Sequence, residues 1–288
     1  MATLEDNKNM WELDVVWKYG GEQWSMAWGG PRMQWYGSIM PRIHRYIPAN
    51  TILEIGSGYG RFSQFLKDYA ENLILVDISE KGIEACKSRF SDEKHIYCFV
   101  NDGKSLDMIH DNSVDFIFTH DALVFVEEDV MAEYIRQFAK KLTKDGVAFI
   151  HHSNLGTYWS FSNLSHKATK LLQEINILEE DHWRARSVSA EKVKEMCHEF
   201  GLESITQEPV VYFTKKTFVD CYSVLVHKDS KWFQEPKIFR NRSFMKEAEN
   251  LRRLSKYYGL PYEKRSNKPI NDLEVLNEKI KSGEVYNI

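Results

Sequence analysis

The stretch LEIGSGYGRF, residues 53–62, decides the fold of this chain. It ends an apolar run with three alternating glycines, and a pattern of apolar residues at helical spacing follows at once, up to Tyr69. Glycines at a strand-to-helix turn let a ligand approach the backbone closely and leave the amide N–H groups accessible. The stretch therefore predicts a ligand site at the carboxyl end of a buried strand.

Outward from this turn, short apolar runs alternate with helical patterns between residues 51 and 152. We expect strands over 51–55, 72–77, 95–100, 114–119 and 146–152, helices over 61–69, 79–90, 127–142 and 189–200, and two further strands within 202–213 and 217–226. This alternation predicts an α/β fold, a Rossmann-like, seven-stranded, mainly parallel sheet with helices on both faces. Ligands of such sheets bind beyond the carboxyl ends of the strands.

The remaining segments flank this domain, which we place at residues 50–228 with an acceptor-binding insertion or lid over 153–188. Residues 1–49 are expected to form an N-terminal aromatic cap, because five of the eight tryptophans fall within the first 35 residues. Residues 229–288 are expected to form a C-terminal helical extension, with one helix over 244–258 and another after Asn271. Its 13 basic and 9 acidic side chains favour a packed tail or a homodimer arm.

Composition narrows the possible partners. The 288 residues include 38 basic and 42 acidic side chains, a net charge of −4, which argues against a cationic nucleic-acid-binding chain. No apolar run is long enough for a transmembrane segment, and the first residues lack a signal-peptide core, so a cytoplasmic protein is expected. The four widely spaced cysteines argue against a zinc site and a disulfide framework.

Two acidic residues follow later strands and strengthen the prediction of a nucleotide-type ligand. Asp77 ends the second strand, where its carboxylate could accept hydrogen bonds from both ribose hydroxyls. Asp102 follows the third strand, where its carboxylate could reach an adenine amino group. A dinucleotide site is the main alternative, but its fingerprint is Gly-x-Gly-x-x-Gly, whereas this loop reads Gly-x-Gly-x-Gly after Glu54. That carboxylate suits a ligand with an ammonium and a sulfonium group better than a pyrophosphate.

The segments EIGSGYG (54–60), Asp77, NDG (101–103) and FIFTHD (116–121) together resemble the class I S-adenosylmethionine-dependent methyltransferases. The resemblance covers residues 50 to 227. It implies S-adenosylmethionine as cofactor, converted to S-adenosylhomocysteine, with the glycine loop at its methionine portion, Asp77 at the ribose, and Asp102 with Gly103 at the adenine. The full set of candidate cofactor-binding residues is Glu54, Gly56, Ser57, Gly58, Gly60, Asp77, Ile78, Asp102, Gly103, Thr119 and Trp28. Many relatives carry a histidine where this chain has Val124-Phe125-Val126, so a catalytic histidine is not expected there.

Histidines at other strand ends could supply the base that an alcohol acceptor needs. We predict His152 as the base, Asp121 as the residue that orients it or the acceptor, and His182 as a catalytic residue of the lid. His151 and His152 cannot both face the cofactor, because side chains alternate along a strand. Candidate acceptor-binding residues are Trp24, Arg32, His120, His151, Asn154, Trp183 and Arg184. A divalent metal is a further option, but the spacing matches no defined metal motif.

The tryptophan cap, the HHSN strand end (151–154) and the HWR segment (182–184) look like methyltransferases associated with bacterial surface polysaccharides. We therefore expect O-methylation of a sugar or sugar-phosphate group of a glycan or its precursor. Methylation of a small aromatic or amine metabolite is the first alternative. A catalytically inactive cofactor-binding scaffold is the second.

Overall fold

The computed structural model describes residues 4–17, 19–161, 184–213 and 216–258. In these ranges the α-helices are α1 (Leu4–Trp11), α2 (Pro31–Gln34), α3 (Met40–Ile43), α4 (Ser63–Leu66), α5 (Glu80–Arg89), α6 (Glu128–Lys141), α8 (Ala190–Glu199) and α9 (Phe244–Tyr258). The strands are β1 (Ala49–Ile55), β2 (Ala70–Asp77), β3 (Ile96–Val100), β4 (Val114–Thr119), β5 (Leu142–Ser153), β6 (Leu202–Val210), β7 (Asp220–His227) and β8 (Lys237–Ile238).

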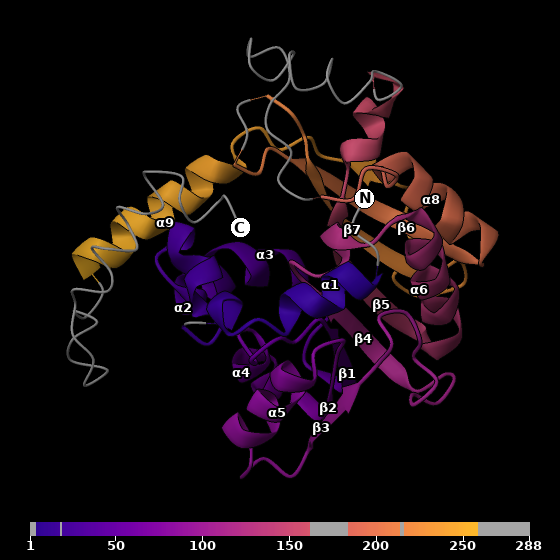
Figure 1. The fold of residues 1–288 in the computed structure, drawn as a ribbon. Coiled ribbons are helices and arrows are strands. Elements are labelled where there is room, and N and C mark those ends of the chain that lie inside the picture. Colours follow the sequence, from indigo (N-terminus) through magenta and orange to yellow (C-terminus); the bar gives the residue numbers. More distant parts are fainter. Residues whose placement is uncertain (1–3, 18, 162–183, 214–215, 259–288) are drawn as a thin grey trace.

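One sheet organises the described chain, and its strand order is β3-β2-β1-β4-β5-β7-β6-β8 (Figure 1). Strands β1 to β5 pair in parallel, and β7 lies antiparallel between β5 and β6. The α/β prediction and its seven strands are thus confirmed. The two-residue strand β8, which pairs with β6, was not predicted.

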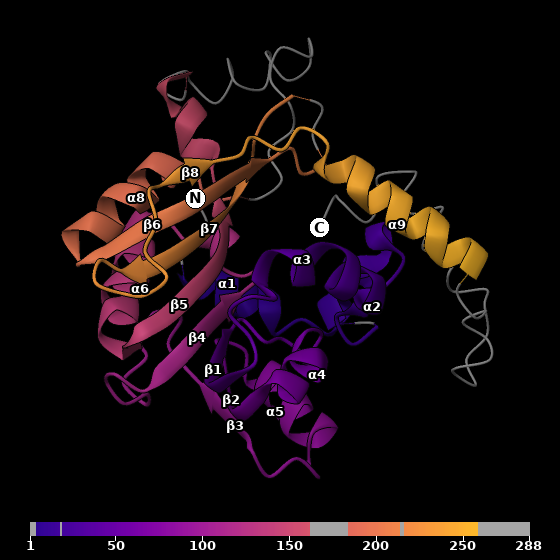
Figure 2. The same cartoon turned by 180° about the vertical axis from the view of Figure 1, so that it is seen from behind.

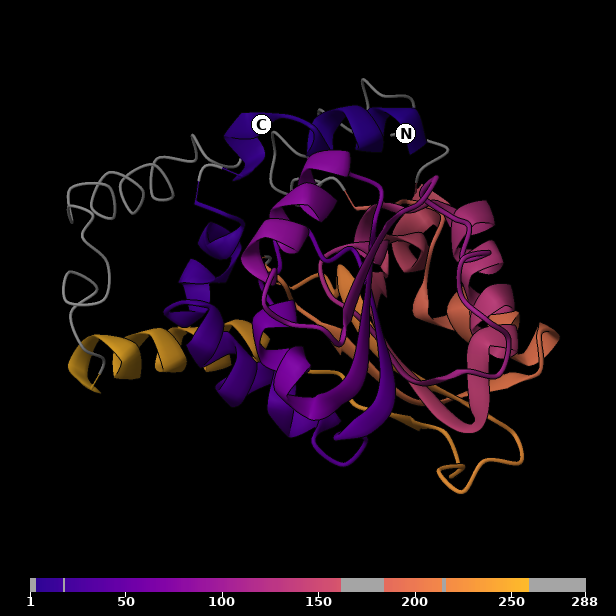
Figure 3. The ribbon, with the colours of Figure 1, turned by 90° about the horizontal axis from the view of Figure 1, so that it is seen from below.

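Two apolar layers cover the sheet. On one face, α6 and α8 pack against apolar side chains such as Leu53 and Ile117. On the other face, α4 and the segment from Trp28 to Ile43 pack against side chains such as Ile52 and Phe116. Figure 3 shows the sheet between these two layers. The carboxyl ends of β1 to β4 remain at the edge between them, where α1 crosses.

The helix α9 packs on the N-terminal segment rather than on the sheet alone. Its first turn buries Phe244 against Trp28, and its later turns lie along residues 22–37 (Figure 2). A Cβ at Gly37 would come within 2.3 Å of the Leu251 side chain, so a larger residue there would require Leu251 to move. Ser255 Oγ donates a hydrogen bond to the carbonyl of Gly29 at 3.1 Å. The first helix of the predicted C-terminal extension therefore joins the N-terminal segment.

Several element boundaries differ from those expected. The helix expected over 61–69 is a short α4 followed by a 3₁₀ turn, Lys67–Tyr69, and β5 begins at Leu142 instead of Gly146. The helix α9 occupies the range expected for it, and Ser189 caps α8 as expected. The last predicted helix lies outside the described residues, as does most of the insertion. No helix of the described ranges is both long and apolar enough to cross a membrane.

Candidate functional site

A pocket lies at the carboxyl ends of β1, β2, β3 and β4. Predicted site residues that line it are Gly56, Asp77, Ile78, Gly103 and Asp121. The N-terminal segment closes it with Leu4, Asn7, Trp11 and Trp17, and the segment after β4 adds Ala122, Leu123, Phe125 and Val126. Asn7 Nδ2 donates to the carbonyl of Phe125 at 3.2 Å, and Trp17 stacks on Tyr59. The cap that reaches the pocket is therefore residues 4–17.

Asp77 holds the two turns that shape the pocket. Its Oδ2 accepts the N–H of Gly58 at 2.7 Å, and its Oδ1 accepts the N–H of Ser79 at 2.8 Å. Burial raises the pKa of this carboxyl, and the backbone N–H groups oppose that shift. Gly58 itself has a φ of +52°, and a Cβ there would meet the Trp17 ring at 2.7 Å. The turn thus requires glycine for its conformation and for its contact with the cap.

Asn101 occupies the place that the sequence suggested for Asp102. Asn101 lines the pocket, accepts the N–H of Gly103 at 3.1 Å and donates to the Tyr134 hydroxyl at 3.1 Å. Asp102 is exposed, and its carboxylate accepts the N–H groups of Lys104 and Ser105 within its own turn. Both residues follow β3 directly, so the sequence alone could not decide which side chain turns inward.

Glu54 points away from the pocket. It is buried and accepts a hydrogen bond from the Ser63 hydroxyl on α4, and burial raises its pKa to about 8. Among the other cofactor candidates, Trp28 is fully buried against Tyr212 and Phe244. Ser57, Gly58, Gly60 and Thr119 lie at the strand ends without lining the pocket. The lining of this pocket therefore does not include these candidates.

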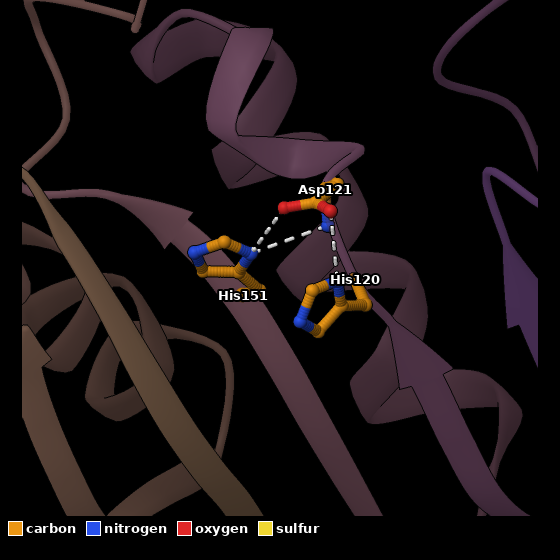
Figure 4. Close-up of side chains that lie close together, drawn as sticks. All are labelled: His120, Asp121 and His151. Atoms are coloured by element: carbon orange, nitrogen blue, oxygen red, sulfur yellow. Dashed lines mark hydrogen bonds and ion pairs between the residues drawn. The ribbon is translucent and has the colours of Figure 1, made fainter. Parts of the chain in front are cut away.

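Asp121 is the centre of a buried polar cluster beside the pocket. Its backbone has a φ of +59°, and its carboxylate accepts a hydrogen bond from Arg61 Nη2 at 2.7 Å. The Nδ1 atoms of His120 and His151 lie 3.1 and 3.2 Å from its two oxygens (Figure 4). Burial would raise the pKa of Asp121, but the two imidazoles and the guanidinium hold it well below its usual range.

His151, not His152, faces this cluster, so the predicted pairing of His152 with Asp121 is wrong. His152 points to the other side of β5, where its Nε2 lies 2.8 Å from Ser223 Oγ and its Nδ1 lies 2.7 Å from the carbonyl of Ser153. Burial lowers the pKa of His152 to about 4. Because His152 is completely buried and these groups occupy both of its ring nitrogens, it cannot reach a ligand in this pocket.

The acceptor-binding candidates are dispersed. Trp24 and Arg32 are exposed on the N-terminal segment, and Asn154 donates to the carbonyl of Phe218. Arg184 makes two hydrogen bonds to the carboxylate of Asp220, at 2.8 and 2.9 Å. His120 lies 3.0 Å from the Tyr222 hydroxyl through Nε2. His182 and Trp183 lie outside the described residues.

Among the described residues, one group of side chains is arranged closely enough to hold a metal ion. It consists of His120, Asp121 and His151. However, the N–H of Asp121 donates to His151 Nδ1 at 3.2 Å, and Arg61 already neutralises the carboxylate. A metal would have to displace the first of these contacts. The observed contacts therefore fit a hydrogen-bonded cluster better than a metal centre.

Sequence comparison finds a similarity over the part of the chain that supplies most of this pocket. Residues 53–150 match the family model of a methyltransferase domain. Over 118 residues, 39% of this chain and 24% of the relative, the chain is 30% identical to phosphoethanolamine N-methyltransferase 1 of Triticum aestivum. It is 25% identical to phosphoethanolamine N-methyltransferase 1 of Caenorhabditis elegans over 114 residues, 40% of this chain and 23% of that protein. The chain spans about a quarter of the length of these curated relatives.

Among solved structures, a similar one is the PH0226 protein of Pyrococcus horikoshii. It is 18% identical, with a TM-score of 0.48 over 67% of this chain and 91% of that chain. The family match covers the segments on which the sequence resemblance rests, from β1 to β5. Residues 53–150, about a third of the chain, are thus similar to a methyltransferase domain.

Proposed function

We propose that this protein is an enzyme that transfers a methyl group from S-adenosylmethionine to a small acceptor beside Asp121. One observation carries the proposal. A single pocket is lined at one side by Gly56, Asp77 and Gly103, and at the other by the ionised carboxylate of Asp121. The first side has the backbone turn and the buried carboxylate that an amino acid and a ribose require. The second side has a charged group where an acceptor could be oriented.

The residues of the pocket fit the cofactor by their chemistry. Asp77 offers carboxylate oxygens to hydroxyl donors. Asn101 and the Gly103 backbone would adjoin the adenine, and apolar groups such as Val126 would contact the face of its flat ring. When bound, S-adenosylmethionine supplies an electrophilic methyl group. The protein's part is to align the acceptor, to exclude water with residues 4–17, and to take up the proton that the acceptor loses.

The best-supported acceptor is an amine. An ionised carboxylate at the pocket attracts an ammonium group, and Asp121 is such a carboxylate. The curated relatives are named as phosphoethanolamine N-methyltransferases, although the matched part is a small share of their length. These two observations favour the metabolite alternative of the sequence analysis.

A sugar hydroxyl is the second candidate. Its support is the imidazole of His151 beside Asp121, since a histidine–carboxylate pair is a common means of taking a proton from an alcohol. Against it, the base predicted for this reaction, His152, is turned away, and Trp24 and Arg32 are exposed on the N-terminal segment, outside residues 4–17. Glycan modification therefore has weaker support than N-methylation.

A panel of acceptors distinguishes these options. The purified protein is incubated with S-adenosylmethionine and either phosphoethanolamine with related small amines, or nucleotide sugars and glycans, and product mass and S-adenosylhomocysteine release are followed. We expect methylated product from the amine set. Product from the sugar set alone would restore the glycan prediction. Tight cofactor binding without turnover on either set would favour the inactive scaffold.

Cofactor binding itself is tested by Asp77→Asn. We expect this change to weaken S-adenosylhomocysteine binding roughly 10- to 100-fold, because it removes a charged hydrogen-bond acceptor from the pocket. Isothermal titration calorimetry gives the dissociation constant. The matched control is Asp102→Asn, an exposed carboxylate one strand away, for which we expect little change. An equal loss of affinity in both variants would support the predicted contact between Asp102 and the adenine. Unchanged affinity in both variants would contradict the proposed site.

A further inference from the structure

A chain of buried polar contacts runs from β7 to the pocket. Asp220 begins β7, is completely buried, and receives both hydrogen bonds from Arg184 described above. Its Oδ2 also lies 3.2 Å from Nε2 of His151 on the neighbouring strand β5. Asp220 therefore has a cation on one side and an imidazole on the other.

His151 continues this chain to the pocket. Its Nδ1 lies 3.2 Å from both the backbone nitrogen and Oδ1 of Asp121, so the neutral ring accepts the N–H there and the protonated ring donates to Oδ1. Asp121 has a left-handed backbone, which is uncommon outside glycine and which aspartate tolerates better than most residues. A support on the amide of that residue fixes the direction of its carboxylate. Asp121 is the member of the chain that lines the pocket.

We propose that Asp220, held by Arg184, is a positioning residue that orients His151 and thereby holds the Asp121 carboxylate toward the acceptor. The Asp220 oxygen at Nε2 fixes the rotation of the ring and favours a proton on that nitrogen. Nδ1 is then directed at Asp121. The functional part of this inference depends on the proposed methyl transfer, since it assumes that Asp121 meets the acceptor. The geometric part does not.

The charged groups around His151 make its pKa a test of the proposal that does not depend on enzyme activity. Burial lowers the pKa of His151, but its contacts with Asp121 and Asp220 outweigh burial and raise it above the ordinary value. Arg184 and His151 in turn lower the pKa of Asp220 to about 2 against the effect of burial. The titratable and charged groups around this imidazole are Asp121, Asp220, His120, His152, Tyr212 and Tyr222, with Arg61 and Arg184 behind the two carboxylates. Removing the Asp220 charge should therefore move the titration of His151 to lower pH.

The test compares Asp220→Asn with Ser223→Ala in the full 288-residue chain. Ser223 lies on the same strand but contacts His152, so it is a matched control for a lost polar contact in β7. In histidine-labelled protein, with His151→Gln used to assign the signal, NMR titration follows the His151 ring. We expect its midpoint to fall in Asp220→Asn and to stay unchanged in Ser223→Ala. An unchanged midpoint in Asp220→Asn would overturn the proposal.

Kinetics supply the second readout. We expect Asp220→Asn to lower kcat at least about 10-fold, as is usual for a buried group that orients a working side chain, while S-adenosylhomocysteine binding stays within a few-fold. The conservative Asp220→Glu should recover part of kcat, which a loss of packing alone would not predict. If Asp220→Asn does not fold, Arg184→Lys tests the same contact from the other side. An unchanged kcat in these variants would contradict the functional part of the inference. If the unchanged protein has no methyltransferase activity but Asp220→Asn still shifts the His151 titration, only the proposed methyl transfer is contradicted.

Discussion

Replacing Asp121 by asparagine is expected to slow methyl transfer roughly 10²- to 10⁴-fold, the range typical of a lost acid–base or orienting group. Asparagine keeps the shape of the side chain and tolerates the left-handed backbone at this position, so the change removes mainly the charge. Single-turnover and steady-state rates measure the loss. Calorimetry with S-adenosylhomocysteine should show binding within a few-fold of the unchanged protein, because Asp77 and the glycine turn stay intact.

The matched control for that experiment is His152→Gln. His152 is as deeply buried as His151, yet it bonds to Ser223 and to the Ser153 carbonyl instead of to Asp121. We expect it to retain turnover within a few-fold when both variants are assayed well below their melting temperatures. Loss of turnover in His152→Gln together with an active Asp121→Asn would restore the base predicted from the sequence.

Replacing Arg42 by methionine is expected to lower the free energy of unfolding by about 3 kcal/mol, the low end for breaking a buried ion pair. Arg42 on α3 donates to both oxygens of Glu208 on β6, at 2.7 and 2.6 Å, and to Glu247 on α9 at 3.2 Å. The guanidinium also lies over the Phe244 ring. Its removal leaves the mostly buried Glu208 carboxylate without its cation. Urea denaturation followed by circular dichroism gives the value.

An exposed ion pair is the natural comparison for Arg42. Lys144 and Asp229 lie 3.6 Å apart, with both side chains more than two-thirds exposed. Surface pairs of this kind contribute well under about 1 kcal/mol, so Lys144→Met should leave the unfolding midpoint almost unchanged. Equal losses in the two variants would mean that Arg42 does not join the N-terminal segment, the sheet and α9 as its contacts indicate.

Local pattern was enough to predict most of the fold. Apolar runs bounded by turn residues predicted β1 to β7. The helix predicted to end before Gly259, over 244–258, is α9 with its observed bounds. Strand β8 escaped prediction because Lys237 and Ile238 are two exposed residues whose pairing depends on β6, not on their own sequence. The α4 region became a short helix and a 3₁₀ turn, a distinction that apolar spacing cannot make.

The sequence predicted the site residues whose positions depend on the local backbone. It did not predict those whose positions depend on packing against distant segments. Gly56 and Asp77 lie in the pocket because turns at strand ends have few alternatives. Alternation along β5 showed that His151 and His152 face opposite ways, but Tyr222 and Asp220 on β7 decide which one meets Asp121. Composition likewise could not tell that Trp28 packs in the core against Phe244, more than 200 residues away in the chain.

Trp11 and Trp17 close the pocket, and Trp17 lies against the Gly58 turn. Indole emission responds to the polarity of its surroundings and to stacked rings. Occupation of the pocket by a purine nucleoside should therefore change the intrinsic fluorescence of the protein. Ligand binding can therefore be followed by the tryptophan fluorescence of the unlabelled protein. Trp17→Phe, which lacks one of the two indoles at the pocket, should show a smaller change.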